Sequence, residues 1–156
     1  MAIDISPEWK EQVRRLFPDL KEGVSFEFTS SVDYNYNCLS WALSCDTRFF
    51  ENAKGSYWPW KDIPDDTADG WAKVCEVFGF TLIETRDTAF LPGYEKIAIF
   101  EDADGDLHAS RQSKNGMWKS KLGGMGPNID HNGLSGLEIV YGKVVRVLRK
   151  RRPDWD

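Results

Sequence analysis

The sequence has few of the residues that disulfide frameworks, metal sites and nucleic-acid surfaces require. Its 156 residues include three cysteines and two histidines. An odd cysteine set without CxxC spacing argues against a disulfide framework, and the absence of any close ligand pair such as CxxC or HxxxH argues against a zinc site. The formal net charge is −5, whereas general nucleic-acid binding usually needs a basic surface. We therefore expect no metal, no organic cofactor and no nucleic-acid partner.

Long apolar runs are also missing. No stretch reaches the roughly 20 apolar residues of a membrane span. Residues 1–6 lack the basic and apolar regions of a signal peptide. We expect no membrane insertion and a cytoplasmic location, with export by a machine that cleaves no signal as the alternative. The sequence carries no signal for an oligomeric state.

What the chain does have is apolar and aromatic content, 41% and 13% of its residues. This predicts one folded domain over residues 1–156 with a core at about 24–148. Cap signals and periodicity predict helices over residues 7–17, 38–45, 67–77 and 134–138, and strands over 23–29, 80–84, 96–100, 107–112, 117–122 and 143–148. Helices packed on such an antiparallel sheet make the predicted fold class α+β.

Cys38 is the first candidate for chemistry. It follows Asn37, a good N-cap, so the thiol opens a helix where free N–H groups and the helix dipole stabilise a thiolate. A thiolate is a strong nucleophile. The alternative is a core residue, because cysteine is among the most buried residue types and Cys38 shares a helix face with Trp41 and Cys45.

His108 is the second candidate. It lies on the predicted strand 107–112, where alternation places it on the face opposite Leu107 and Ala109. A hairpin turning at Asn115-Gly116 is expected to add two lysines, Lys119 and Lys121, to the His108 face and to leave Ser120 on the other. A polar face of this kind predicts a general base beside Cys38, with a simple exposed histidine as the alternative.

These residues belong to motifs that resemble a known family. The segments around Cys38, His108 and Trp118 read YNCxxWA, HAxRQ and GxWxSKLG. Over residues 33–148 the chain resembles a family of small bacterial proteins of unknown function. More distantly, a cysteine that opens a helix and a histidine on a later strand resemble papain-like and NlpC/P60-like Cys-His hydrolases, which implies their fold.

A third catalytic residue is needed to orient the imidazole. The NlpC/P60 resemblance implies a polar histidine in this role, which favours His131, with Gln112 on the His108 strand as the second choice. Tyr36 and Asn37, next to the nucleophile, are candidates for an oxyanion site with the Cys38 backbone N–H.

Further side chains are candidates for binding. Trp58 and Trp60 lie in a long irregular connection, residues 46–64, and are expected to line a substrate groove, unless they cover a core edge. Arg111 and Lys121 are candidates for an anionic substrate group. Asp102, Asp104 and Asp106 lack the full EF-hand spacing, so a hairpin turn is favoured over a calcium loop.

Two hypotheses of function follow. The first is a cysteine hydrolase or acyl-transfer enzyme, in which Cys38 attacks an amide, peptide or isopeptide bond and His108 transfers the proton. The second is a non-catalytic binding or immunity-type protein on the same scaffold, whose partner is another protein. A Cys38–His108 separation of about 4 Å at a cleft would favour the enzyme.

Overall fold

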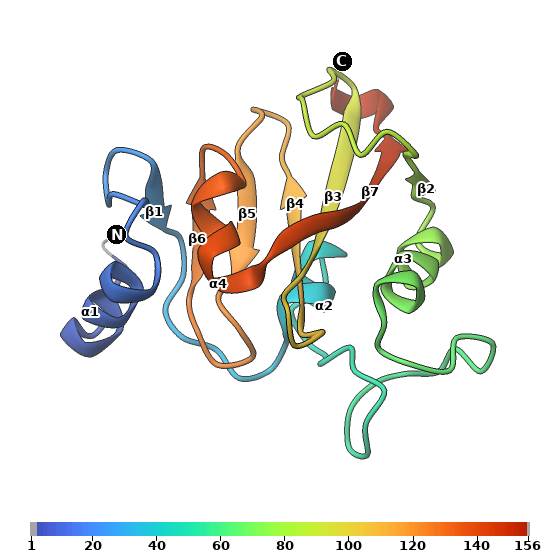
Figure 1. Cartoon of the computed structure of the whole chain (residues 1–156), viewed down its shortest axis with the longest axis horizontal. Helices are drawn as coiled ribbons and strands as arrows, with labels where there is room; N and C mark the ends of the chain where they lie inside the picture. The colour runs from blue at the N-terminus through green and yellow to red at the C-terminus, as the bar shows by residue number, and fades with distance from the viewer. Residues whose placement is uncertain (1–2, 156) are drawn as a thin grey trace.

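A computed structural model describes residues 3–155 (Figure 1). The strands are β1 (Phe26–Phe28), β2 (Thr81–Leu82), β3 (Tyr94–Glu101), β4 (Leu107–Gln112), β5 (Trp118–Lys121), β6 (Asn128–His131) and β7 (Lys143–Arg151). They form one antiparallel sheet in the order β1-β6-β5-β4-β3-β7-β2. The helices are α1 (Pro7–Leu16), α2 (Cys38–Ala42), α3 (Ala68–Val77) and α4 (Glu138–Tyr141), with 3-10 turns η1 (Ser135–Leu137) and η2 (Pro153–Trp155). The class is mixed α and β, as predicted.

The helices begin where the sequence places caps. The Ser6 hydroxyl accepts a hydrogen bond from the Trp9 N–H, and the Thr67 hydroxyl accepts one from the Gly70 N–H. Each bond satisfies a donor that a helix start leaves unpaired. The predicted starts of α1 and α3 are therefore confirmed.

Helix α2 is shorter than predicted. Asn37 and Ser40 form a reciprocal capping box at its start, which fixes Cys38 as its first residue. The helix ends at Ala42 rather than near Cys45, and Ser44 adopts a left-handed backbone with φ of 63°. Such a conformation stops an α-helix.

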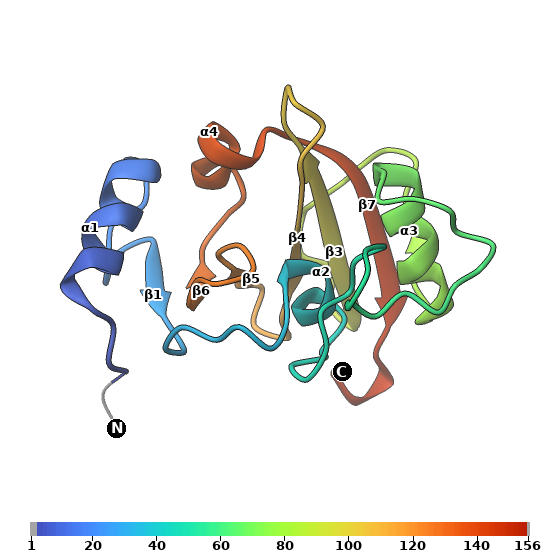
Figure 2. The same cartoon turned by 90° about the horizontal axis from the view of Figure 1, so that it is seen from below.

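Each face of the sheet carries its own apolar core. On one face α2 and α3 pack over buried residues that include Leu39, Val74, Ile97, Ile99 and Ala109. On the other face α1 and the η1–α4 segment pack over residues that include Phe17, Phe100, Trp118, Ile129 and Leu137. Figure 2 shows α1 and α4 together above β1, β5 and β6. Because both faces are covered, a polar side chain on β4 or β5 is not automatically exposed.

The main difference between the predicted and the observed elements is strand β6. No strand was predicted over residues 128–131, but they form one between β1 and β5. The last strand also continues to Arg151 rather than ending near Leu148. None of the helices in residues 3–155 is long and apolar enough to cross a membrane.

Candidate functional site

Cys38 stands at the start of α2, but its thiol is buried. Its side chain is only 7% exposed and belongs to the core that contains Ala109. Burial raises the pKa of the Cys38 thiol to about 11, although hydrogen bonds from the backbone of Ala109 and Leu39 act in the opposite direction. Desolvation disfavours the charged form more than the short helix favours it. The thiol is therefore protonated at neutral pH, contrary to the prediction.

His108 lies on the opposite face of the sheet from Cys38. It is 1% exposed, pairs with Phe100 in the β3–β4 ladder and stacks on the Tyr141 ring at a centroid distance of 3.7 Å. The β4 side chains on the Cys38 face are the His108 neighbours Leu107 and Ala109, and Arg111, which lies over the Trp41 ring of α2. The predicted contact between Cys38 and His108 is therefore wrong, because strand alternation turns the imidazole away once Ala109 faces α2.

The β4–β5 hairpin also has a different register from the predicted one. Gln112 pairs with Trp118, and Arg111 pairs with Lys119. Ser120 therefore lies on the His108 face, and Lys121 lies on the Cys38 face. The turn runs from Ser113 to Met117, which hydrogen-bond to each other, rather than closing directly on Asn115-Gly116. A shift of one residue exchanges the two faces of a strand, so the predicted polar face was wrong.

The His108 face contains a closed hydrogen-bond network instead of a cleft. The His131 Nδ1–H donates to the Gly133 carbonyl oxygen at 2.7 Å. Because a carbonyl oxygen only accepts, Nε2 of His131 is left to accept from the Ser120 hydroxyl at 2.8 Å. Ser110 donates to Ser120 at 2.6 Å, and His108 Nε2 lies 3.3 Å from both hydroxyl oxygens. These four side chains are buried.

Burial keeps both imidazoles neutral. It lowers the pKa of His131 to about 4, and burial with the neighbouring His131 lowers the pKa of His108 well below its usual value. Ser120 thus links His131 to His108, as the third residue of a catalytic triad is linked to its histidine. Neither histidine contacts Cys38. Gln112 is also buried, and its amide donates to the Gly116 carbonyl oxygen. The four predicted catalytic side chains do not meet at one place.

The predicted oxyanion residues have structural partners. The Asn37 side-chain oxygen accepts from the Ser40 N–H, and its amide nitrogen donates to the Phe50 carbonyl oxygen. The Tyr36 hydroxyl accepts from the Asn128 amide at 2.9 Å. Both side chains are buried. They hold the segment before α2 in place, and of the two only Asn37 lines the cleft beside Cys38.

The predicted binding tryptophans cover an edge of the core. The Trp58 indole N–H donates to the Ile63 carbonyl oxygen, and the Trp58 and Trp60 rings meet edge to face at 5.2 Å. Both rings pack against the α2–α3 core. Neither of them lines the cavity beside Cys38, so for these two rings the alternative interpretation, cover of a core edge, agrees with the structure.

The two predicted anion-binding cations are also engaged. The Arg111 guanidinium lies over the Trp41 ring at 4.5 Å and donates to the Ser44 hydroxyl. The Lys121 ammonium donates to the carbonyl oxygens of Gly126 and Gly123 at 2.9 and 3.3 Å. Burial lowers the pKa of Lys121 to about 8. Lys121 thus holds the turn between β5 and β6 rather than facing a substrate.

A cleft of about 370 Å³ lies beside Cys38. Cys38 and Leu107 line it together with two aromatic side chains, Phe49 and Trp71. Its charged lining residues are Glu51, Asp66 and Asp106, and it is also lined by backbone at Gly105, Gly123 and Gly124. Cavities of this size accept small ligands or single side chains.

Among the residues that line this cleft, only Asn37 and Cys38 were predicted site residues, and Asp106 was assigned to a hairpin turn. Glu51 lies in the irregular connection, and Asp66 follows this connection just before α3. Asp106 ends the β3–β4 turn, and Trp71 lies on α3. The glycines at 123 and 124 were interpreted only as the end of a strand. Their one usable signal is the space that a glycine leaves: a Cβ on Gly124 would meet the Phe49 ring at 2.6 Å.

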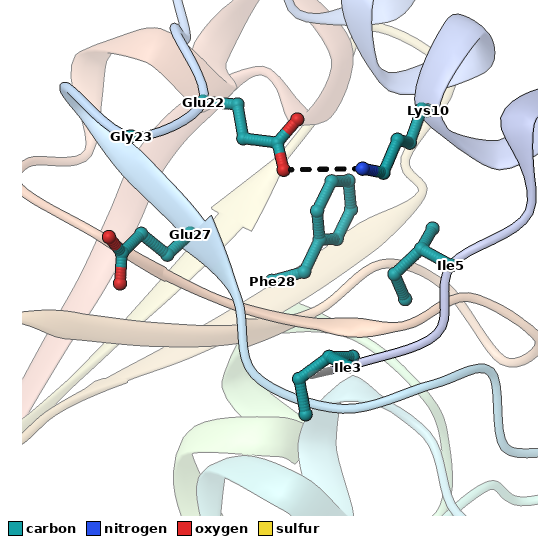
Figure 3. Close-up of a pocket in the computed structure, with 7 residues that line it drawn as sticks. All are labelled: Ile3, Ile5, Lys10, Glu22, Gly23, Glu27 and Phe28. Carbon is teal, nitrogen blue, oxygen red and sulfur yellow. Dashed lines mark ion pairs between the residues drawn. The ribbon is translucent and has the colours of Figure 1, made fainter. Parts of the chain in front are cut away.

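Two further features were considered as sites. The carboxylates of Asp102, Asp104 and Asp106 lie within 4.8 Å of one another, but Asp102 Oδ1 accepts from the N–H groups of the other two. This is the expected hairpin turn. A hollow of about 260 Å³ lies between α1 and β1. Its apolar wall includes Ile5 and Phe28 (Figure 3). The Lys10–Glu22 ion pair, 3.7 Å long, spans the hollow.

Comparison with known families identifies the chain as a member of a family described as a domain of unknown function (DUF7689), matched over residues 27–149. The matched region begins in β1, so α1 precedes it. No curated protein and no solved structure matches the chain. Membership in a family of unknown function is thus confirmed, and the relationship to papain-like enzymes stays a prediction.

Proposed function

We propose that this protein is a non-catalytic binding protein whose ligand occupies the cleft at Cys38. The observation that carries the proposal is the identity of the β4 side chains on the Cys38 face, Leu107, Ala109 and Arg111. None of them can act as a base, because the first two are apolar and the guanidinium is already protonated. A cysteine hydrolase needs a base beside its nucleophile, and this cleft offers none from β4.

We also propose that the scaffold is papain-like. A cysteine at the start of a helix packs on an antiparallel meander, β3 to β5, in the order that the resemblance predicts. On this scaffold the cleft beside the cysteine is where such enzymes bind a substrate. We propose that here the same place binds a partner without cleaving it.

The proposal is tested by the alkylation rate of Cys38 across pH. Cys45 is partly exposed, so the measurement uses a Cys45→Ser background in which the remaining Cys75 is buried. The rate constant with iodoacetamide is expected to rise continuously from pH 7 to pH 10, because only the thiolate reacts. His108→Gln, if folded by circular dichroism, is expected to give the same profile. A plateau reached below pH 8, or a slower reaction in His108→Gln, would restore the hydrolase hypothesis.

A further inference from the structure

The charge of the Cys38 cleft has one sign. Its carboxylates come from three separate segments: Glu51 from the irregular connection, Asp66 from the start of α3, and Asp106 from the β3–β4 turn. None of the described residues that line the cleft is basic. Lys121, the buried cation whose charge acts on Cys38, donates to Gly123 and Gly126 and does not line the cleft. The carboxylate charge in the cleft is therefore not balanced from within its walls.

One carboxylate is already fixed before any ligand arrives. Asp66 Oδ1 accepts from the Trp71 indole N–H at 3.0 Å, and Asp66 Oδ2 accepts from the Asn52 backbone N–H at 2.9 Å. Glu51 and Asp106 have no side-chain hydrogen bond or ion pair to other described residues. A pre-oriented carboxylate lowers the ordering cost of binding, and the two others are free to approach a ligand.

The rest of the lining is apolar or aromatic. Trp71 and Phe49 supply ring surface, and Leu107 and the protonated Cys38 thiol supply a surface without charge. Aromatic faces attract ammonium and guanidinium groups, and alkyl chains pack on apolar walls. The lining thus combines a surface for an alkyl chain with carboxylates for a cationic end.

We infer that the cleft binds an alkyl chain that ends in a cation, an ammonium or guanidinium group. This inference rests on the proposed function and names its ligand class. A lysine or arginine side chain of a partner and a free small amine share this chemistry. The expected pose packs the chain on Leu107 and the aromatic rings and directs the cation to Glu51, Asp66 and Asp106.

Three matched four-carbon probes test the charge requirement: butylamine, butyramide and butyrate, each titrated at pH 7 into the ¹⁵N-labelled full chain. The Trp71 indole N–H is the reporter, since it donates to Asp66 at the cleft. Butylamine is expected to shift this resonance with saturation, and the neutral and anionic probes are not. Equal shifts with butyramide or butyrate would overturn the cation assignment.

Matched variants locate the binding. Asp106→Asn and Glu51→Gln are each expected to weaken butylamine binding about two- to fivefold, as the loss of one exposed charge pair does. Asp104→Asn removes the same charge from the same turn at a residue that does not line the cleft, and is expected to change nothing. If Asp104→Asn weakens binding as much as Asp106→Asn, the effect is long-range charge and the site assignment fails.

A further titration with peptides distinguishes a lysine side chain of a partner protein from a free amine. The blocked tripeptide Ac-Gly-Lys-Gly-NH₂ is compared with butylamine and with the same tripeptide carrying norleucine. Tighter binding of the lysine peptide than of butylamine indicates a protein partner, and tighter binding of butylamine indicates a free amine. Failure of every cationic probe overturns this inference alone. The proposed function fails separately, through an activated Cys38 in the alkylation profile.

Discussion

The polar groups on the two faces of β4 differ in whether they have partners within the protein. On the α4 face, His108, Ser110, Ser120 and His131 satisfy one another and the Gly133 carbonyl, and all four are buried. On the α2 face, the carboxylates of Glu51 and Asp106 line a cleft. On one face of β4 the four polar side chains therefore find their hydrogen-bond partners within the protein. On the other face the carboxylates have no cation beside them among the described residues that line the cleft.

The comparison shows that chemically reactive residue types do not by themselves mark a site. The histidines, which suggested catalysis, take part in a network that stabilises the fold. Residues that gave no chemical signal, such as Glu51 and Trp71, line the accessible cavity. A buried polar group with all its partners is rigid and inert, whereas open polar groups next to an apolar wall can recognise a ligand.

The largest expected effect is that of acid on the free energy of unfolding, because acid protonates the two histidines on the α4 face. Both imidazole pKa values are lowered in the fold, so below the unfolded value of about 6.5 the unfolded chain binds more protons. Stability should fall as pH decreases from 6.5 and, for His131, level off near its folded pKa of about 4. Two histidines at about 1.4 kcal/mol per pH unit each give up to about 4 kcal/mol by pH 5. Urea unfolding at several pH values measures this.

The control for the acid effect is internal, because the chain contains only these two histidines. The double variant His108→Gln/His131→Gln, if it folds, should lose the decline between pH 6.5 and pH 5. An equal decline in that variant would show that carboxylates cause it.

Truncating His108 is expected to have the next largest effect. His108→Ala removes a buried ring stacked on Tyr141 and leaves the Ser110 hydroxyl without its donor. The expected loss is about 3 kcal/mol in the free energy of unfolding, from cavity formation and an unsatisfied polar group. Asp106→Asn, on the cleft side, should change the free energy of unfolding by less than about 0.5 kcal/mol. Similar losses of stability for the two variants would show that the polar groups on the two faces contribute equally to folding.

A base can be placed on the Cys38 face to sharpen the comparison. Leu107 lines the cleft beside Cys38, so Leu107→His brings an imidazole to the face from which His108 is turned away. The expected result is about tenfold faster iodoacetamide alkylation of Cys38 at pH 7, since a nearby imidazolium lowers a thiol pKa. Leu107→Gln is the matched control without a titratable ring. Equal acceleration in both variants would mean that the change acts through access to the thiol.

The smallest effect is expected at the rim of the cleft. Gly124→Ala pushes a Cβ against Phe49, whose ring is the movable partner, so the cost in stability should be about 1 kcal/mol or less. Because Phe49 lines the cleft, butylamine affinity should change. Gly133→Ala is the control, since a Cβ there meets nothing within 4 Å. An unchanged affinity in Gly124→Ala would show that Phe49 does not contact the ligand.

Local signals in the sequence determined most of the helices and strands. Ser6-Pro7 and Thr67 fix helix starts through side-chain caps, and the bounds predicted for β4 agree with the structure. The sequence also predicted a strand over 96–100, and these residues belong to β3, which lies between β4 and β7. These features depend on contacts within a few residues, which a sequence displays directly.

The tertiary structure alone decided which residues share a site. The prediction followed the Asn115-Gly116 signal, while the chain pairs Gln112 with Trp118, and this one-residue difference moved Ser120 to the His108 face. Whether Cys38 is reactive depended on how deeply α2 and the sheet bury it, which the Asn37 cap does not reveal. Sequence by itself determined the elements because their causes are local. Register, face and burial were left to the packing of the whole chain because they depend on residues far apart in sequence.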